Sequence, residues 1–253
     1  MAHGYRSLQQ WNQWLGQEFL GQQLLASEQA LLAKTKILKR HFGKHALLVG
    51  VPKQHSILES TSVPCHSLLT PLVHHQDHAI QIEGDFHHLP LLTGSIDLVI
   101  LPHTLELIDT PRQLLTEACR IVKPEGLIVI FGFNPHSMWG ARRLLTRQKI
   151  TPWSGNFLKP QAIKHWLNLA EFALEKQKTI LYRPPVKNKT LYDRFQFIER
   201  MGQYIFPLFG GVYMIVARAK VIPLTPIRMK WKQQLSGIRI FTSMTGHIAR
   251  QSK

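Results

Sequence analysis

Three residues that could take part in chemistry, Gly50, Asp85 and His103, each lie at or just past the end of a strand-like segment. Ligands of open parallel sheets bind at the carboxyl ends of the strands. His103 could act there as a general base. The alternative is a loop histidine held by hydrogen bonds, and the sequence favours that alternative because most histidines in loops have such a structural role.

Five histidines crowd one stretch of the sequence: His74, His75, His78, His87 and His88. Clusters of this kind can bind metal, but no cysteine lies at ligand spacing, and His74 and His78 would need a helix to face the same way. We therefore expect solvated loop histidines and no metal site.

Strand-like and helix-like segments alternate along the chain. Apolar runs predict strands at 45–50, 65–69, 79–83, 96–101, 127–133, 172–182 and 211–219. Apolar residues three and four apart predict helices at 7–42, 109–122 and 161–169, with breaks at Gly16, Gly21 and Gly43. The alternation predicts an α/β fold: a doubly wound sheet with helices on both faces, preceded by an N-terminal helical segment.

Four sequence pieces occur in a fixed order between residues 84 and 126. They are Gly84-Asp85-Phe86-His87-His88-Leu89-Pro90, Ser95-Ile96-Asp97-Leu98-Val99, Leu105-Glu106-Leu107-Ile108-Asp109-Thr110-Pro111 and Glu117-Ala118-Cys119-Arg120-Ile121-Val122-Lys123-Pro124-Glu125-Gly126. Together with the 12-residue spacing from Asp85 to Asp97, they resemble class I S-adenosylmethionine (SAM) dependent methyltransferases of the type 11 family. The resemblance covers residues 41–135, and the flanking segments resemble one proteobacterial subgroup.

The resemblance implies a Rossmann-like sheet of seven mostly parallel strands, the last one antiparallel. It places strand Leu47–Val49 at the centre, between Cys65–Leu69 and Ile96–Leu101. It also implies SAM as the cofactor. Asp85 would accept a hydrogen bond from the adenine amino group and Phe86 would line the adenine slot, in a cleft that includes Gly50 and His103. Methyl transfer to a nitrogen or carbon that is already nucleophilic needs only alignment, so no base is required.

The chain departs from the family pattern at the first loop. The family carries an acidic residue followed by three alternating glycines, whereas Val49-Gly50-Val51-Pro52-Lys53-Gln54 keeps only Gly50. Pro52 has no N–H to donate. No acidic residue lies between Glu59 and Asp77, where the ribose partner is expected, and Leu107 replaces the histidine of the third piece.

The composition is strongly basic. The 253 residues include 31 Lys and Arg against 15 Asp and Glu, a net charge of +16, which favours an anionic partner such as nucleic acid or a phospholipid surface. Two cysteines cannot form a disulfide framework. No apolar run reaches the roughly 20 residues of a transmembrane helix. We expect a cytoplasmic protein, or one peripheral to the inner membrane.

The sequence divides into a helical segment at 1–43, a methyltransferase-like domain at 44–219 and a basic tail at 220–253. The tail has seven Lys or Arg and no acid, and it could hold the protein near nucleic acid or anionic lipid. A helix at 139–149 would have a basic and an apolar face, and the aromatic insertion at 182–209 could roof a substrate site or simply pack in the core.

Three functions remain open. The first is a SAM-dependent methyltransferase with an unidentified acceptor. The second is a non-catalytic binding module for RNA or a partner protein, suggested by the altered glycine loop. The third is a peripheral membrane methyltransferase for a lipid or quinone-like acceptor.

Overall fold

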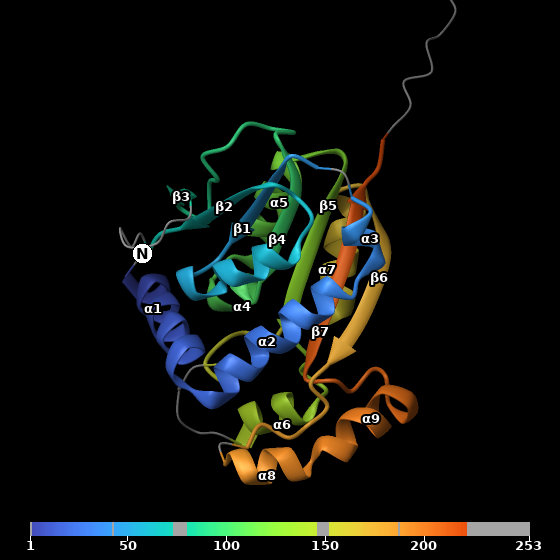
Figure 1. Ribbon diagram of the computed structural model, residues 1–253. Coiled ribbons are helices and arrows are strands. Elements are labelled where there is room, and N and C mark those ends of the chain that lie inside the picture. Colours follow the sequence, from blue (N-terminus) through green and yellow to red (C-terminus); the bar gives the residue numbers. More distant parts are fainter. Residues whose placement is uncertain (1, 42, 73–79, 146–151, 187, 222–253) are drawn as a thin grey trace, which may run out of the picture. The chain divides into compact units, whose positions relative to one another are not determined.

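The central feature of the fold is one seven-stranded sheet, in the order β3-β2-β1-β4-β5-β7-β6 (Figure 1). The computed structural model describes residues 2–41, 43–72, 80–145, 152–186 and 188–221. Within them the strands are β1 His45–Val49, β2 Cys65–Thr70, β3 Ile80–Glu83, β4 Ile96–Pro102, β5 Val122–Phe133, β6 Phe172–Ile180 and β7 Val212–Ala219. The predicted tail at 220–253 lies, beyond Val221, outside the described residues, as do His74, His75 and His78.

Strand β1 is central, as the sequence predicts. It pairs in parallel with β2, where Leu47 lies opposite Ser67, and with β4, where Leu47 lies opposite Val99. Four of the five β1 residues are buried, and β4 is buried along nearly its whole length. Strands that are covered on both faces need such continuous apolar runs, which explains why these two were easy to recognise in the sequence.

The antiparallel last strand is also confirmed, because β7 runs antiparallel to both β5 and β6. Strand β5 differs from the prediction by starting at Val122 instead of Leu127. Val122 already pairs with Ile96 of β4, and the register shifts before Leu98 and Leu127 pair. Glu125 takes a positive φ of 63° within this irregular stretch. Strand β5 therefore begins before Pro124-Glu125-Gly126, and these three residues form an irregular bend within it.

Helices cover both faces of the sheet. They are α1 Ala2–Gln17, α2 Phe19–Ala33, α3 Lys36–Lys39, the 3-10 helix η1 Pro52–Ser60, α4 Thr104–Leu107, α5 Pro111–Ile121, α6 Met138–Leu145, α7 Pro160–Leu169, α8 Lys189–Arg194 and α9 Gln196–Ile205. Figure 1 shows α2 and α3 on the near face and α5 and α7 behind the sheet. This two-sided cover is the doubly wound arrangement that the alternating pattern predicts.

The N-terminal helices form part of the core. Trp11, Leu15, Leu24 and Leu32 are almost completely buried and pack with the sheet residues. The break between α1 and α2 falls at Glu18, which is extended, and not at Gly16 or Gly21 as the sequence predicts. Gly21 lies inside α2, where a Cβ atom would overlap the backbone of α1. The glycine therefore permits close packing of two helices and does not end one.

Among the described residues no helix is long and apolar enough to cross a membrane. The same part of the chain contains no group of three or more His, Cys, Asp or Glu residues that could hold a metal ion.

Candidate functional site

His103 lies at the carboxyl end of β4, on the edge of the sheet where the sequence predicts the site. It adopts a left-handed backbone conformation with φ 59°, and only 1% of its surface is exposed. Its Nε2 lies 2.7 Å from Oε1 of Glu28 on α2, and its Nδ1 lies 3.0 Å from Oε2 of Glu106 on α4. Both ring nitrogens are therefore engaged, so the residue has the hydrogen-bonded role that the sequence favours.

The electrostatics of this cluster follow from two carboxylates around one imidazole. Burial disfavours the charged ring, but Glu28 and Glu106 outweigh it and raise the pKa of His103 to about 9. Glu106 also accepts the Phe133 N–H at 2.6 Å. The other oxygen of Glu28, Oε2, is buried without a hydrogen-bond partner. The raised pKa favours a positively charged His103 ring, while burial also raises the pKa of Glu106. Both nitrogens of the enclosed ring are engaged by glutamates, so neither is free to meet a substrate.

Aromatic rings enclose the same cluster. The Phe133 ring centroid lies 4.2 Å from that of His103. The ring centroid of Trp11, on α1, lies 5.4 Å from that of His103. Trp11 in turn stacks on Trp14. The carboxyl ends of β4 and β5 are therefore covered by α1 and α2. Glu28 and Trp11 escaped the sequence prediction, although Glu28 is the one acid in the apolar stretch 19–33.

The altered glycine loop is filled by the chain's own side chains. The Gln54 carboxamide accepts the Val51 N–H at 3.1 Å and donates to the Pro102 carbonyl oxygen at 2.9 Å, joining the ends of β1 and β4. A Cβ atom at Gly50 would collide with the same carboxamide. Thr104 donates to the Val49 carbonyl oxygen. Gln54 therefore takes the place beside Gly50 that an open glycine loop would leave free.

Asp85 lies just past the end of β3, and its side chain is exposed. One carboxylate oxygen, Oδ1, accepts the His87 N–H at 3.1 Å, which makes a local turn. Phe86 is 4% exposed and packs in the hydrophobic core. The structure thus brings Gly50 and His103 together on the closed part of the edge and leaves Asp85 at the surface.

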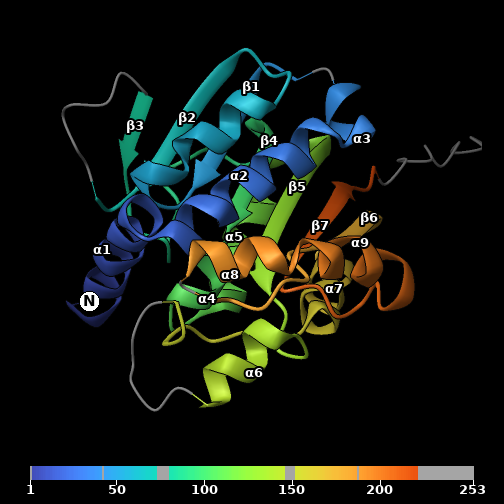
Figure 2. The ribbon, with the colours of Figure 1, turned by 60° about the horizontal axis from the view of Figure 1, so that its bottom comes forward.

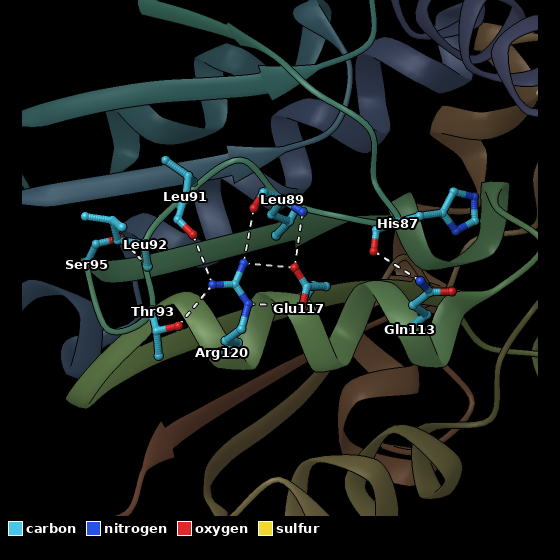
Figure 3. A network of polar contacts seen from close by, with 9 residues as sticks. All are labelled: His87, Leu89, Leu91, Leu92, Thr93, Ser95, Gln113, Glu117 and Arg120. Atoms are coloured by element: carbon cyan, nitrogen blue, oxygen red, sulfur yellow. Dashed lines mark hydrogen bonds and ion pairs between the residues drawn. The ribbon is translucent and has the colours of Figure 1, made fainter.

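The fourth sequence piece fixes the loop that follows Asp85 (Figure 3). Arg120 donates to both carboxylate oxygens of Glu117 at 3.0 and 2.9 Å and to the carbonyl oxygens of Leu89 and Leu91. Glu117 also accepts the Leu89 N–H. The Arg120 guanidinium holds the pKa of the Glu117 carboxyl below its usual value. This pair therefore positions residues 89–93 on α5, and Gln113 of the same helix donates to the His87 carbonyl oxygen.

Asp97 has a comparable structural role at the opposite edge of the sheet. It accepts the backbone N–H groups of Lys44 and His45 and pairs with the Lys123 ammonium at 2.9 Å. Burial opposes ionisation, but these partners outweigh it and lower the pKa of Asp97. The 12-residue spacing from Asp85 to Asp97 thus separates an exposed residue from one that anchors the start of β1 and β5.

The family and the sequence relatives agree with this architecture. Residues 66–130 match the family model described as a methyltransferase domain. The uncharacterized protein YafS of Escherichia coli (strain K12) is 32% identical over 164 residues, which are 63% of this chain and 63% of that protein. The chain thus matches less than two thirds of the length of this relative.

Solved structures share the fold at low sequence identity. A SAM-dependent methyltransferase of Thermotoga maritima superposes with a TM-score of 0.60 at 16% identity, over 86% of this chain and 100% of that one. The methyltransferase in the complex with the Haloferax volcanii Trm112 activator gives 0.56 at 13% identity, over 83% and 98%. The chain has the fold of the class I SAM-dependent methyltransferases. Residues 66–130, the part that matches the methyltransferase domain model, lie within this fold and span β2 to β5.

The residues present fit the two ends of SAM unequally. At the adenine end, the exposed Asp85 carboxylate on its fixed loop can accept a hydrogen bond from an amino group. At the methionine end, the Val51 N–H is already bound to Gln54, and Pro52 supplies no N–H. At the end of β2 stands Thr70, which is buried and whose hydroxyl accepts the Leu72 N–H. The residues at the adenine end of the site therefore suit SAM. The residues at the methionine end do not suit it while the Gln54 side chain binds the Val51 N–H and fills the space beside Gly50.

Proposed function

We propose that this chain is a SAM-dependent methyltransferase acting on an acceptor still to be identified. The observation that carries the proposal is the exposed Asp85 carboxylate, held at the end of β3 on a loop that the Glu117–Arg120 pair fixes to α5. An acceptor at this position suits recognition of an adenine amino group, because a carboxylate accepts a charge-assisted hydrogen bond.

SAM supplies an electrophilic methyl group when it is bound. For the protein, the task is then to align an acceptor and to exclude water, and no side chain needs to remove a proton if the acceptor is already nucleophilic. The enclosed state of His103 agrees with such a reaction, since both ring nitrogens are held by carboxylates. We assign His103 a positioning role in which it ties α2 to the end of β4.

Calorimetric titration with SAM and with its demethylated product, S-adenosylhomocysteine, tests the proposal. Asp85→Ala should weaken SAM binding by about tenfold or more, because the substitution removes a charged acceptor. Asp193→Ala, which removes an exposed carboxylate on α8, is the matched control and should bind as the wild type does. Equal binding by wild type and Asp85→Ala would remove Asp85 from the cofactor site.

A second candidate function is a non-catalytic module that kept the methyltransferase fold. The Gln54 bridge between Val51 and Pro102 favours it, because this bridge closes the methionine end of the cleft. Absence of any SAM or S-adenosylhomocysteine binding by the folded wild-type protein would decide for this candidate.

A further inference from the structure

Exposed apolar side chains gather on α9 and the segment that follows it. Fifteen large hydrophobic residues are exposed in the described chain, and six of them lie between 197 and 209. We call these six the apolar surface: Phe197, Met201, Tyr204, Phe206, Leu208 and Phe209. Each is more than half exposed, and four are aromatic. A patch this dense is unusual on a surface that meets only water.

The face of α9 opposite the apolar surface is packed and hydrogen-bonded to the rest of the protein. Phe197, Met201 and Tyr204 follow one another at helical spacings of four and three, so they share one face of α9. The other face carries Gly202, packed against the Tyr182 ring, and Glu199, which accepts the backbone N–H groups of Leu181 and Tyr182. The apolar face is therefore presented outward by a helix whose opposite side is fixed to the protein.

Helix α6 adds apolar and basic groups at the same end of the molecule. Figures 1 and 2 both show α6 and α8 at the end where β5 leads into α6. Leu144 and Leu145 are 84% and 83% exposed. Beside them, the Arg142 and Arg143 guanidinium groups lie over the rings of Trp153 and Phe157, at 5.3 and 5.1 Å from the ring centroids. Residues 138–145 contain no acid.

We infer that this end of the molecule docks on the surface of an anionic phospholipid bilayer. Aromatic and aliphatic side chains enter the boundary between headgroups and acyl chains, and neighbouring arginines meet the lipid phosphates. The net charge of +16 attracts the protein to such a surface. A nucleic acid would neutralise the cations but would leave the exposed leucines and phenylalanines in water, so a bilayer satisfies both features together.

A cavity of about 640 Å³ opens beside the apolar surface. Pro207 and Leu208 line it together with residues of α2 and β6, and Lys34 and Lys178 are among its lining residues. Resting on the proposed methyltransferase function, this arrangement favours an acceptor carried by the bilayer over one taken from bulk water. Docking itself does not require catalysis, so binding to vesicles and binding of SAM can fail independently.

Co-sedimentation of the full-length protein with vesicles tests the docking surface. Vesicles of phosphatidylcholine alone are compared with vesicles that also contain phosphatidylglycerol, at low and moderate salt and without SAM. We expect binding to the anionic vesicles that weakens with salt. Phe197→Ser/Phe206→Ser/Phe209→Ser should lower the bound fraction at limiting lipid at least about tenfold, because three side chains lose their apolar contact.

The matched control is Ile80→Ser/Leu92→Ser/Leu169→Ser, which removes three residues that are at least as exposed but lie elsewhere. It should bind vesicles within about twofold of the wild type. Both variants keep residues 222–253, so the charge of the tail is the same in each. The inference is overturned if the two variants bind alike or if the wild type binds no anionic vesicles. It is also overturned if light scattering shows a dimer that only the 197/206/209 variant disrupts, since a second copy would then cover the surface.

Discussion

The two halves of the sheet's carboxyl edge differ in how they are closed. At the ends of β1, β4 and β5, the chain fills the space with Gln54, Trp11 and a buried imidazolium between two carboxylates. At the end of β3, Asp85 is exposed and its loop is fixed from the side by Arg120. The closed half contains the altered glycine loop and Glu106 of the third sequence piece, and the open half contains the first and fourth pieces.

The altered loop at residues 49–54 is thus a packed structural element. Pro52 begins the helix η1, and Gln54 bonds to two backbone groups, the Val51 N–H and the Pro102 carbonyl oxygen. The loop thus has hydrogen bonds and packing where an open loop would offer a ligand surface. The kept residues on α5 still position a loop at the surface.

Removing the Glu28 carboxylate should have the largest effect on the closed half. Glu28→Ala leaves the buried imidazolium with one carboxylate, and breaking a buried ion pair costs about 3–5 kcal/mol of unfolding free energy. Urea denaturation measures this loss. Glu59→Ala removes an exposed carboxylate and should change the unfolding free energy by less than about 0.5 kcal/mol. If Glu28→Ala lowers the unfolding free energy as little as Glu59→Ala does, the ion pair between Glu28 and His103 does not stabilise the closed half.

The unfolding free energy should fall between pH 6.5 and about 9. The folded-state pKa of His103 is raised to about 9 from 6.5, so its stabilising contribution is complete below pH 6.5 and is lost as the pH rises through 9. The linked loss is on the order of 3 kcal/mol. Urea denaturation across this range measures it, and the fall should be smaller in Glu28→Ala. Identical pH profiles for the two proteins would contradict a charged His103.

Opening the glycine loop should have the smallest effect on stability and a clear effect on the cofactor. Gln54→Gly frees the Val51 N–H and the space beside Gly50, at a cost of about 1–3 kcal/mol in unfolding free energy. Calorimetry should show SAM bound about tenfold more tightly than by the wild type. Gln161→Gly, which alters an exposed glutamine on α7, is the control for a general effect of glycine. Unchanged or weaker SAM binding by Gln54→Gly would remove Gln54 as the obstacle.

The sequence predicts the sheet well because its strands are local signals. The run Leu47-Leu48-Val49 and the run Leu98-Val99-Ile100 are continuously apolar, and the family resemblance supplies their order. The break at Glu18 was not predictable in the same way, since Gly16 and Gly21 are stronger helix breakers in isolation. Packing of α1 against α2 decides that point, and packing is not a local property.

The candidate site was predicted in part for the same reason. Asp85 and Gly50 were proposed from the family resemblance and their places near strand ends, whereas the partners of His103 were not predicted. Glu106 lies three residues away within a recognised motif, whereas Glu28 lies 75 residues away on a helix that reads as amphipathic. Nothing in the spacing of residues 19–33 indicates that one carboxylate faces a histidine after β4.

The contact between Glu28 and His103 also sets an order of events during synthesis. Helices α1 and α2 leave the ribosome first, but the imidazole that neutralises Glu28 follows 75 residues later. At elongation rates of about 5–20 residues per second, the interval is roughly 4–15 seconds. During that time Trp11, Leu15 and Leu24 have no sheet to cover, so the nascent N-terminal helices present an apolar face that suits binding by a chaperone until β4 emerges.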